Sequence, residues 1–237
     1  MESKTEEAGG GLLRTLSVEN FEKLRGIMYI SKAEKGSYLF REGEIADKLY
    51  YLFQGQVRTT KSSDVGRTLT LYLHQAGDLL GQVDPFQDGV HGFSAEVTEN
   101  ASIGTLQRKD VEVLVWQDGD FALEWMRWMG LMHRLTQTKF RDLMLFGKTG
   151  ALCSLLIRLC NSYGKTDEGK IEINLKISNT EMADMIGATR ESVNRMLSEL
   201  RKKGVIDYAN GYYVVHDLEY LREICHCDNC PKEICRM

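Results

Sequence analysis

Residues 178–206, SNTEMADMIGATRESVNRMLSELRKKGVI, decide how the rest of the chain is interpreted. Their pattern predicts two short helices separated by a turn at Gly187, because glycine commonly ends helices. Thr180 is the predicted N-cap of the first helix, and Thr189 that of the second. Apolar residues recur at helical spacing, which predicts one buried face on each helix. They are Met182, Ala183 and Ile186 in the first helix and Val193, Met196, Leu197 and Leu200 in the second.

The opposite face of the second helix carries the polar side chains Arg190, Glu191, Asn194 and Arg195. Such a face suits a helix-turn-helix, whose second helix enters the DNA major groove with its N-terminal side chains at the base edges. Arginine can bind guanine through two hydrogen bonds, and glutamate can accept one from cytosine. A helical hairpin with a solvated charged face is the alternative interpretation.

Two apolar runs follow the second helix, on either side of Asn210-Gly211. Asn-Gly between apolar runs is a strong signal for a tight β-hairpin. A helix-turn-helix followed by a hairpin is a winged helix. The stretch Gly187-Ala-Thr-Arg-Glu-Ser-Val-Asn-Arg-Met-Leu resembles the recognition segment of the CRP/FNR superfamily of bacterial transcription regulators, and the resemblance covers nearly the whole chain.

This resemblance implies an α+β fold with four parts. They are an N-terminal β jelly roll similar to the cyclic-nucleotide-binding fold (residues 1–118), a long dimerisation helix (119–147), a winged helix-turn-helix DNA-binding domain (148–216) and a cysteine-rich tail (217–237). The resemblance also implies double-stranded DNA, a second copy of the chain and RNA polymerase as partners.

The charge of the whole chain does not suggest DNA binding, but the charge of one region does. The chain has 237 residues and a formal net charge of −4, yet residues 127–203 carry 14 Lys and Arg against 8 Asp and Glu. Such asymmetry suits an acidic sensor attached to a basic DNA-binding module. No membrane span or signal peptide is expected, which predicts a cytoplasmic protein without a membrane partner. Six cysteines in a cytosolic chain indicate metal or redox chemistry.

The N-terminal half is predicted to be rich in β-strands. Residues 1–11 are predicted to be frayed and residues 18–28 to form a helix, with Ser17 as its cap. Between residues 30 and 114, short β-prone runs alternate with glycines, as in a sandwich or barrel. Among these runs, Phe40-Arg-Glu-Gly-Glu and Tyr51-Leu-Phe-Gln-Gly-Gln-Val resemble the cyclic-nucleotide-binding fold.

The family's nucleotide pocket uses a Gly-Glu pair and an Arg-Ser pair, and the matching positions here read Gly81-Gln82 and Phe93-Ser94. A cyclic phosphate without a cation or an array of amides loses its main source of binding energy. Cyclic AMP is therefore not expected to bind. Another small ligand in the barrel stays open as an alternative.

A long helix is predicted over residues 121–146, and its apolar residues form two adjacent stripes. The first contains Phe121, Trp125, Trp128, Met132 and Leu135, and the second Ala122, Met126, Met129, His133, Thr136, Phe140 and Leu143. Two stripes indicate that one side faces the chain's own barrel and the other a partner helix in a parallel dimer. One broad core face is the alternative. The first stripe continues to Asp142, which needs a cation, an arginine, a metal or a capping role, because an unpaired buried carboxylate is costly.

The segments after the long helix lead to a cysteine-rich tail. Residues 148–150 are the predicted hinge, 151–163 a helix, 171–177 a strand and 217–223 a short helix. Cys227, Cys230 and Cys235 can surround one centre, and zinc with Cys225 as fourth ligand is chemically reasonable. The spacing is a strong metal signal but does not identify the metal.

The tail resembles that of the Gram-positive FNR type, whose C-terminal cysteines hold an iron–sulfur cluster. This resemblance implies one [4Fe–4S] cluster per subunit, held by Cys227, Cys230 and Cys235. The resemblance also implies Asp142 as the fourth ligand of the cluster, and Cys225 and Asp228 are the alternatives. Loss of the cluster is then expected to free the tail and lower specific DNA binding.

The leading hypothesis is an oxygen-responsive transcription regulator that controls anaerobic gene expression and binds TGTGA-type palindromes as a homodimer. The alternative is a zinc-stapled or thiol-redox regulator of the same family, with a small-molecule effector in the β-roll. A redox enzyme is disfavoured, because no nucleophile–base constellation or dinucleotide fingerprint accompanies the cysteines.

Overall fold

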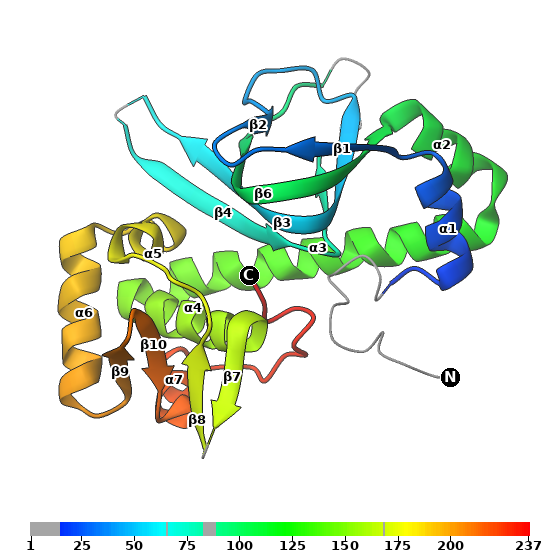
Figure 1. Cartoon of the computed structure of the whole chain (residues 1–237). Helices are drawn as coiled ribbons and strands as arrows, with labels where there is room; N and C mark the ends of the chain where they lie inside the picture. The colour runs from blue at the N-terminus through cyan, green and yellow to red at the C-terminus, as the bar shows by residue number, and fades with distance from the viewer. Residues whose placement is uncertain (1–14, 65, 83–88, 168) are drawn as a thin grey trace. The chain divides into compact units, whose positions relative to one another are not determined.

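The computed structural model describes residues 15–64, 66–82, 89–167 and 169–237, so the predicted frayed residues 1–11 lie outside the described part. The chain forms two compact units, Met1–Ser63 with Leu71–Gly130 and Asp64–Thr70 with Leu131–Met237 (Figure 1). The first unit is rich in strands and the second in helices, which confirms the predicted α+β class. No helix in the described ranges is long and apolar enough to cross a membrane.

One sheet dominates the first unit. Its strands are hydrogen-bonded in the order β1-β6-β3-β4, with β2 paired to β6 and β5 to β3. The elements are α1 (Val18–Gly26), β1 (Tyr29–Ala33), β2 (Tyr38–Phe40), β3 (Lys48–Ser62), β4 (Thr68–Gln75), β5 (Leu79–Gly81), β6 (Ser94–Gln107) and α2 (Arg108–Gln117), followed by the start of α3 (Gly119–Leu145).

The long strands β3 and β6 pair in an antiparallel manner, and the register shifts between Leu52 and Val57. Gly55 lies at this irregularity with a φ of +92°, and a Cβ there would lie 2.5 Å from the carbonyl oxygen of Asn100. Only glycine fits such a close backbone approach with a positive φ. The irregularity bends the strands around a core that includes Leu52, Val57, Val97 and Ile103.

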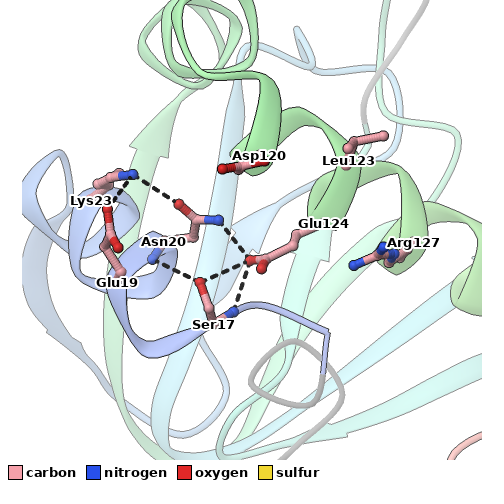
Figure 2. A pocket seen from close by; sticks show the side chains of 8 residues that line it. All are labelled: Ser17, Glu19, Asn20, Lys23, Asp120, Leu123, Glu124 and Arg127. Carbon is pink, nitrogen blue, oxygen red and sulfur yellow. Dashed lines mark hydrogen bonds and ion pairs between the residues drawn. The ribbon is translucent and has the colours of Figure 1, made fainter.

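Helix α1 is fixed to α3 within the first unit by polar contacts (Figure 2). Ser17 caps α1 as predicted, and its hydroxyl accepts a hydrogen bond from the Asn20 amide. The Ser17 amide and the Asn20 side-chain amide each donate to the Glu124 carboxylate over 2.8 Å. Asn20 is buried, and the carboxylate satisfies its side-chain donor, so the polar group does not destabilise the packing.

The second unit carries a smaller antiparallel sheet in the order β7-β8-β10-β9. Asn210 and Gly211 both have positive φ, at 55° and 90°, so the predicted tight hairpin joins β9 and β10. After α3, the elements are α4 (Gly147–Tyr163), β7 (Gly164–Asp167), β8 (Lys170–Ile173), α5 (Asn179–Met185), α6 (Arg190–Lys202), β9 (Ile206–Ala209), β10 (Tyr212–Val215) and α7 (Leu218–Ile224).

Three local predictions are wrong in this unit. Ser178, rather than Thr180, caps α5, because Ser178 and Glu181 form a reciprocal capping box. The predicted hinge 148–150 lies inside α4, and the chain turns earlier, at Gly147, whose φ is +59°. The predicted strand 171–177 ends at residue 173, and residues 164–167 form an additional strand that pairs with it.

Candidate metal centre and nucleic-acid interface

Helix α6 presents its polar face to solvent. Its N-cap is Thr189, whose hydroxyl accepts a hydrogen bond from the Ser192 amide, as the sequence predicted. Its apolar residues Val193, Met196, Leu197 and Leu200 are buried. The four predicted DNA-contacting residues, Arg190, Glu191, Asn194 and Arg195, are all exposed on the first two turns. The structure therefore brings these side chains together on one accessible helix face.

Asn194 belongs to a chain of hydrogen bonds that the sequence did not predict. The Tyr213 hydroxyl on β10 donates to the Asn179 side chain on α5, over 2.5 Å. The Asn179 amide in turn donates to the Asn194 side-chain oxygen. These bonds connect the wing, α5 and α6, and they fix the orientation of the helix that carries the exposed arginines.

The C-terminal tail follows α7, which packs against α4 (Figure 1). Asp217 caps α7, and the tail then turns, with positive φ at His226 and Asn229. The Ile234 and Cys235 amides both donate to the Pro231 carbonyl, over 3.0 and 2.9 Å.

Three side chains on the last two turns of α4 bind the end of this tail. Arg158 donates to the Ile234 carbonyl over 3.1 Å, and Asn161 to the Cys235 carbonyl over 2.7 Å. Ser162 accepts from the Met237 amide over 3.0 Å. The tail is therefore an ordered part of the second unit.

The three cysteines predicted as cluster ligands are electrostatic neighbours. Burial raises the pKa of Cys235 to about 12; Arg158 opposes this effect, and Cys230 and Cys227 reinforce it. Burial, with Cys227 and Asp142 adding to it, likewise raises the pKa of Cys225 to about 11. These buried thiols hold their protons at neutral pH, so a metal must displace a proton to bind them.

The sulfur atoms of Cys227, Cys230 and Cys235 suit a soft metal, although they are not arranged around one point in this structure. Thiolates select zinc, copper(I) or iron–sulfur clusters. Within the described ranges, no group of three or more His, Cys, Asp or Glu side chains is arranged to hold a metal ion as it stands. Cys227 and Cys230 are partly exposed, and each follows a residue with positive φ, His226 or Asn229.

Asp142 is buried and its positive partners are arginines. Arg158 donates to Oδ2 over 2.8 Å, and Ser154 donates to the same oxygen. Arg141 donates to Oδ1 over 2.8 and 3.1 Å, and it also pairs with Asp228 in the tail. Both carboxylate oxygens are thus engaged. The sequence analysis did not identify Arg158 as the positive partner of Asp142. A single charged residue within the apolar run of α4 could have indicated it.

The two stripes of α3 lie in different environments. Phe121, Trp125, Trp128, Leu135 and Asp142 of the first stripe are buried. In the second stripe, Met126, Met129 and Phe140 are 58%, 44% and 65% exposed. The alternative of one broad core face within the chain is therefore wrong, because these apolar side chains of α3 are exposed.

The predicted nucleotide-pocket positions carry no cation of their own. Gln82 accepts a hydrogen bond from the Gly92 amide over 2.9 Å, and Ser94 accepts one from the Glu42 amide over 3.0 Å. Phe93 is 38% exposed. Gln82 and Ser94 thus each hold a backbone amide of a neighbouring segment.

Two family models match the chain. A model described as "Crp-like helix-turn-helix domain" matches residues 150–224, and one described as "Cyclic nucleotide-binding domain" matches residues 30–118. These ranges contain the α5–α6 helix pair with its wing and the strands of the first unit.

Curated relatives and solved structures extend this similarity to most of the chain. The "Anaerobic regulatory protein" of Bacillus subtilis (strain 168) is 41% identical over 224 residues, which cover 94% of each chain. A "CRP-like cAMP-activated global transcriptional regulator" of Mycobacterium tuberculosis (strain ATCC 25618 / H37Rv) is 24% identical over 187 residues, covering 79% of this chain and 84% of that one. A CooA mutant from Carboxydothermus hydrogenoformans has the same fold, with a TM-score of 0.76 at 19% identity, over 94% of this chain and 98% of that one.

Proposed function

This chain belongs to the CRP/FNR superfamily of transcription regulators, and we propose that it is an oxygen-responsive member that controls anaerobic gene expression from the cytoplasm. The observation that carries this proposal is the combination of 41% identity to an anaerobic regulatory protein with a tail of cysteines ordered against α4. No enzymatic activity is proposed, since the similar proteins are transcription regulators.

DNA recognition is assigned to the exposed start of α6. Arg190, Glu191 and Arg195 resemble the positions that read TGTGA half-sites in CRP-like members, and all three are exposed. We propose a palindrome of TGTGA half-sites in successive major grooves, about one helical turn apart. RNA polymerase is the proposed partner of the DNA-bound protein.

The DNA assignment is tested with two arginine variants of the same helix. Arg195→Ala should weaken binding to a TGTGA palindrome by about 1–3 kcal/mol and relax discrimination at its guanine. Arg201→Ala, in the last turn of α6, should change the affinity for all sequences alike and leave discrimination between bases intact. Fluorescence anisotropy on site variants measures both effects. A binding-site selection that returns TTGAT half-sites would refute the assignment.

The homodimer is assigned to the exposed stripe of α3. Apolar surface of this kind is stabilised when it packs against the same stripe of a second copy. Phe140→Lys should shift the sedimentation coefficient toward that of a monomer, whereas Lys139→Ala on the neighbouring row should not. A dimer that survives Phe140→Lys together with Met129→Lys would place the interface elsewhere.

Oxygen sensing is assigned to a [4Fe–4S] cluster, one per subunit, held by Cys227, Cys230 and Cys235. When bound, such a cluster supplies reactivity toward oxygen. Asp142 is the proposed fourth ligand, and because arginines engage both of its oxygens, ligation requires one of those contacts to give way. The alternative fourth ligands are Cys225, buried at the end of α7, and Asp228, which pairs with Arg141.

Absorption spectroscopy of anaerobically purified protein tests the cluster. A broad band at about 400 nm supports it, and its loss in air supports oxygen sensitivity. Serine at any one of the three cysteine ligands should abolish the band together with anaerobic DNA binding, whereas Cys225→Ser should leave both nearly intact. A colourless protein that contains zinc would instead support the zinc-stapled regulator.

A further inference from the structure

Arg158 is a buried cation in the central, largely apolar part of α4. Every residue from Gly150 to Cys160 is buried, and the Arg158 side chain is only 4% exposed. A buried charge is strongly destabilising unless it is paired and hydrogen-bonded. The position of Arg158 therefore depends on its partners.

These partners come from two segments outside α4. Nη2 donates to the Asp142 carboxylate over 2.8 Å and to the Thr138 hydroxyl over 3.1 Å, both on α3. Nη1 donates to the Ile234 carbonyl over 3.1 Å, in the tail. The planar guanidinium directs several donors in fixed directions, which a lysine ammonium on its flexible stem does not. Arg158 thus joins α3, α4 and the tail at a single side chain.

The contact with Ile234 is reinforced farther along α4. Asn161 binds the next carbonyl, that of Cys235, and Ser162 binds the Met237 amide. All of these bonds join protein atoms, so none of them requires a metal. They hold the main chain on both sides of the Cys235 sulfur.

We propose that Arg158 is a positioning residue for the cysteine tail. By joining the Asp142 carboxylate to the Ile234 carbonyl, it fixes Cys235 on α4 whether or not a metal is bound. The inference rests on the proposed function in one respect, namely that this tail carries the cluster ligands. It also replaces the expectation that losing the cluster frees the whole tail: residues 234–237 stay docked.

Hydrogen exchange measured by mass spectrometry on the full chain, reduced and treated with a chelator, tests this proposal. The peptide covering residues 226–237 should exchange slowly in the wild type. Arg158→Gln should accelerate its exchange by about tenfold or more, the factor that corresponds to a hydrogen bond with a charged donor. Arg134→Gln, the same change at an exposed position of α3, should leave it unchanged. Unchanged tail exchange in a folded Arg158→Gln protein would overturn the proposal.

Two milder variants keep the test decisive if Arg158→Gln does not fold. Arg158→Lys keeps the positive charge beside Asp142 but lacks the planar guanidinium that also reaches the Ile234 carbonyl. The α4 amides should therefore stay protected from exchange, while the tail amides exchange faster. Full tail protection in this variant would show that charge alone suffices and would refute the bridging role. Asn161→Ala removes only the bond to the Cys235 carbonyl and should accelerate tail exchange without affecting α6.

Anaerobic cluster reconstitution separates this inference from the proposed function. A wild-type protein that never develops cluster absorption contradicts the proposed function, while its tail exchange still reports on Arg158. If the wild type does assemble a cluster, Arg158→Lys should assemble it several-fold more slowly, because Cys235 is no longer held in place. Equal assembly rates combined with equal tail exchange would exclude a positioning role.

Discussion

The buried pair of Arg158 and Asp142 makes a quantitative prediction for the stability of the second unit. Both side chains are only 4% exposed, so the removal of one leaves the other as an incompletely compensated buried charge. Loss of one partner from such a pair costs about 3–5 kcal/mol. Arg158→Met should cost about 3 kcal/mol, at the low end of that range, because Arg141 still binds Asp142.

The reciprocal change should cost more. Asp142→Leu leaves the Arg158 guanidinium bound to the uncharged oxygens of Thr138 and Ile234, and a loss of about 4 kcal/mol is expected. The double variant removes both charges and should lose only about 2 kcal/mol, for the unpaired Ser154 hydroxyl and Ile234 carbonyl. The two single effects should therefore be strongly non-additive.

Native-state hydrogen exchange of the α4 amides, in reduced and chelator-treated protein, is the appropriate assay. It reports the opening free energy of the second unit separately, which matters because a chain of two units need not unfold in one step. A double variant whose loss equals the sum of the two single losses would refute the reasoning. So would an Asp142→Leu protein that loses less than about 1 kcal/mol.

Three further predictions concern the first unit. Gly55→Ala should lower its stability by more than about 2 kcal/mol in urea unfolding, because both a positive φ and a carbonyl contact oppose a Cβ, whereas Gly36→Ala, in open space, should lose only about 1–2 kcal/mol. Burial lowers the pKa of His91 from its ordinary value of 6.5, so below that pH the unfolded chain binds a proton that the folded chain does not. Stability should therefore fall as the pH drops below 6.5, and His91→Gln should flatten this dependence; an equally steep profile in the variant would contradict the assignment. Cyclic AMP should not change DNA affinity, since Gln82 and Phe93 occupy the expected Glu and Arg positions, and saturable binding in calorimetry would contradict this.

Features that depend only on neighbouring residues could be predicted before the structure was known. The α6 stripe, its Thr189 cap and the Asn210-Gly211 hairpin follow from helical periodicity, capping and turn chemistry, which act over a few residues. The same local reasoning failed for the N-cap of α5, because Thr180 and Ser178 are both acceptable residue types at that position. Ser178 is the N-cap because it forms reciprocal hydrogen bonds with Glu181.

The tertiary structure alone decided the environment of the candidate metal centre. The sequence showed that Asp142 needed a positive partner, but an arginine and a metal satisfied that need equally. Arg158 follows Asp142 by 16 residues, and the Ile234 carbonyl lies 76 residues beyond Arg158. Contacts over such separations depend on how α3, α4 and the tail pack together, and hydrophobic periodicity within one helix carries no information about which charged group on another segment will meet it.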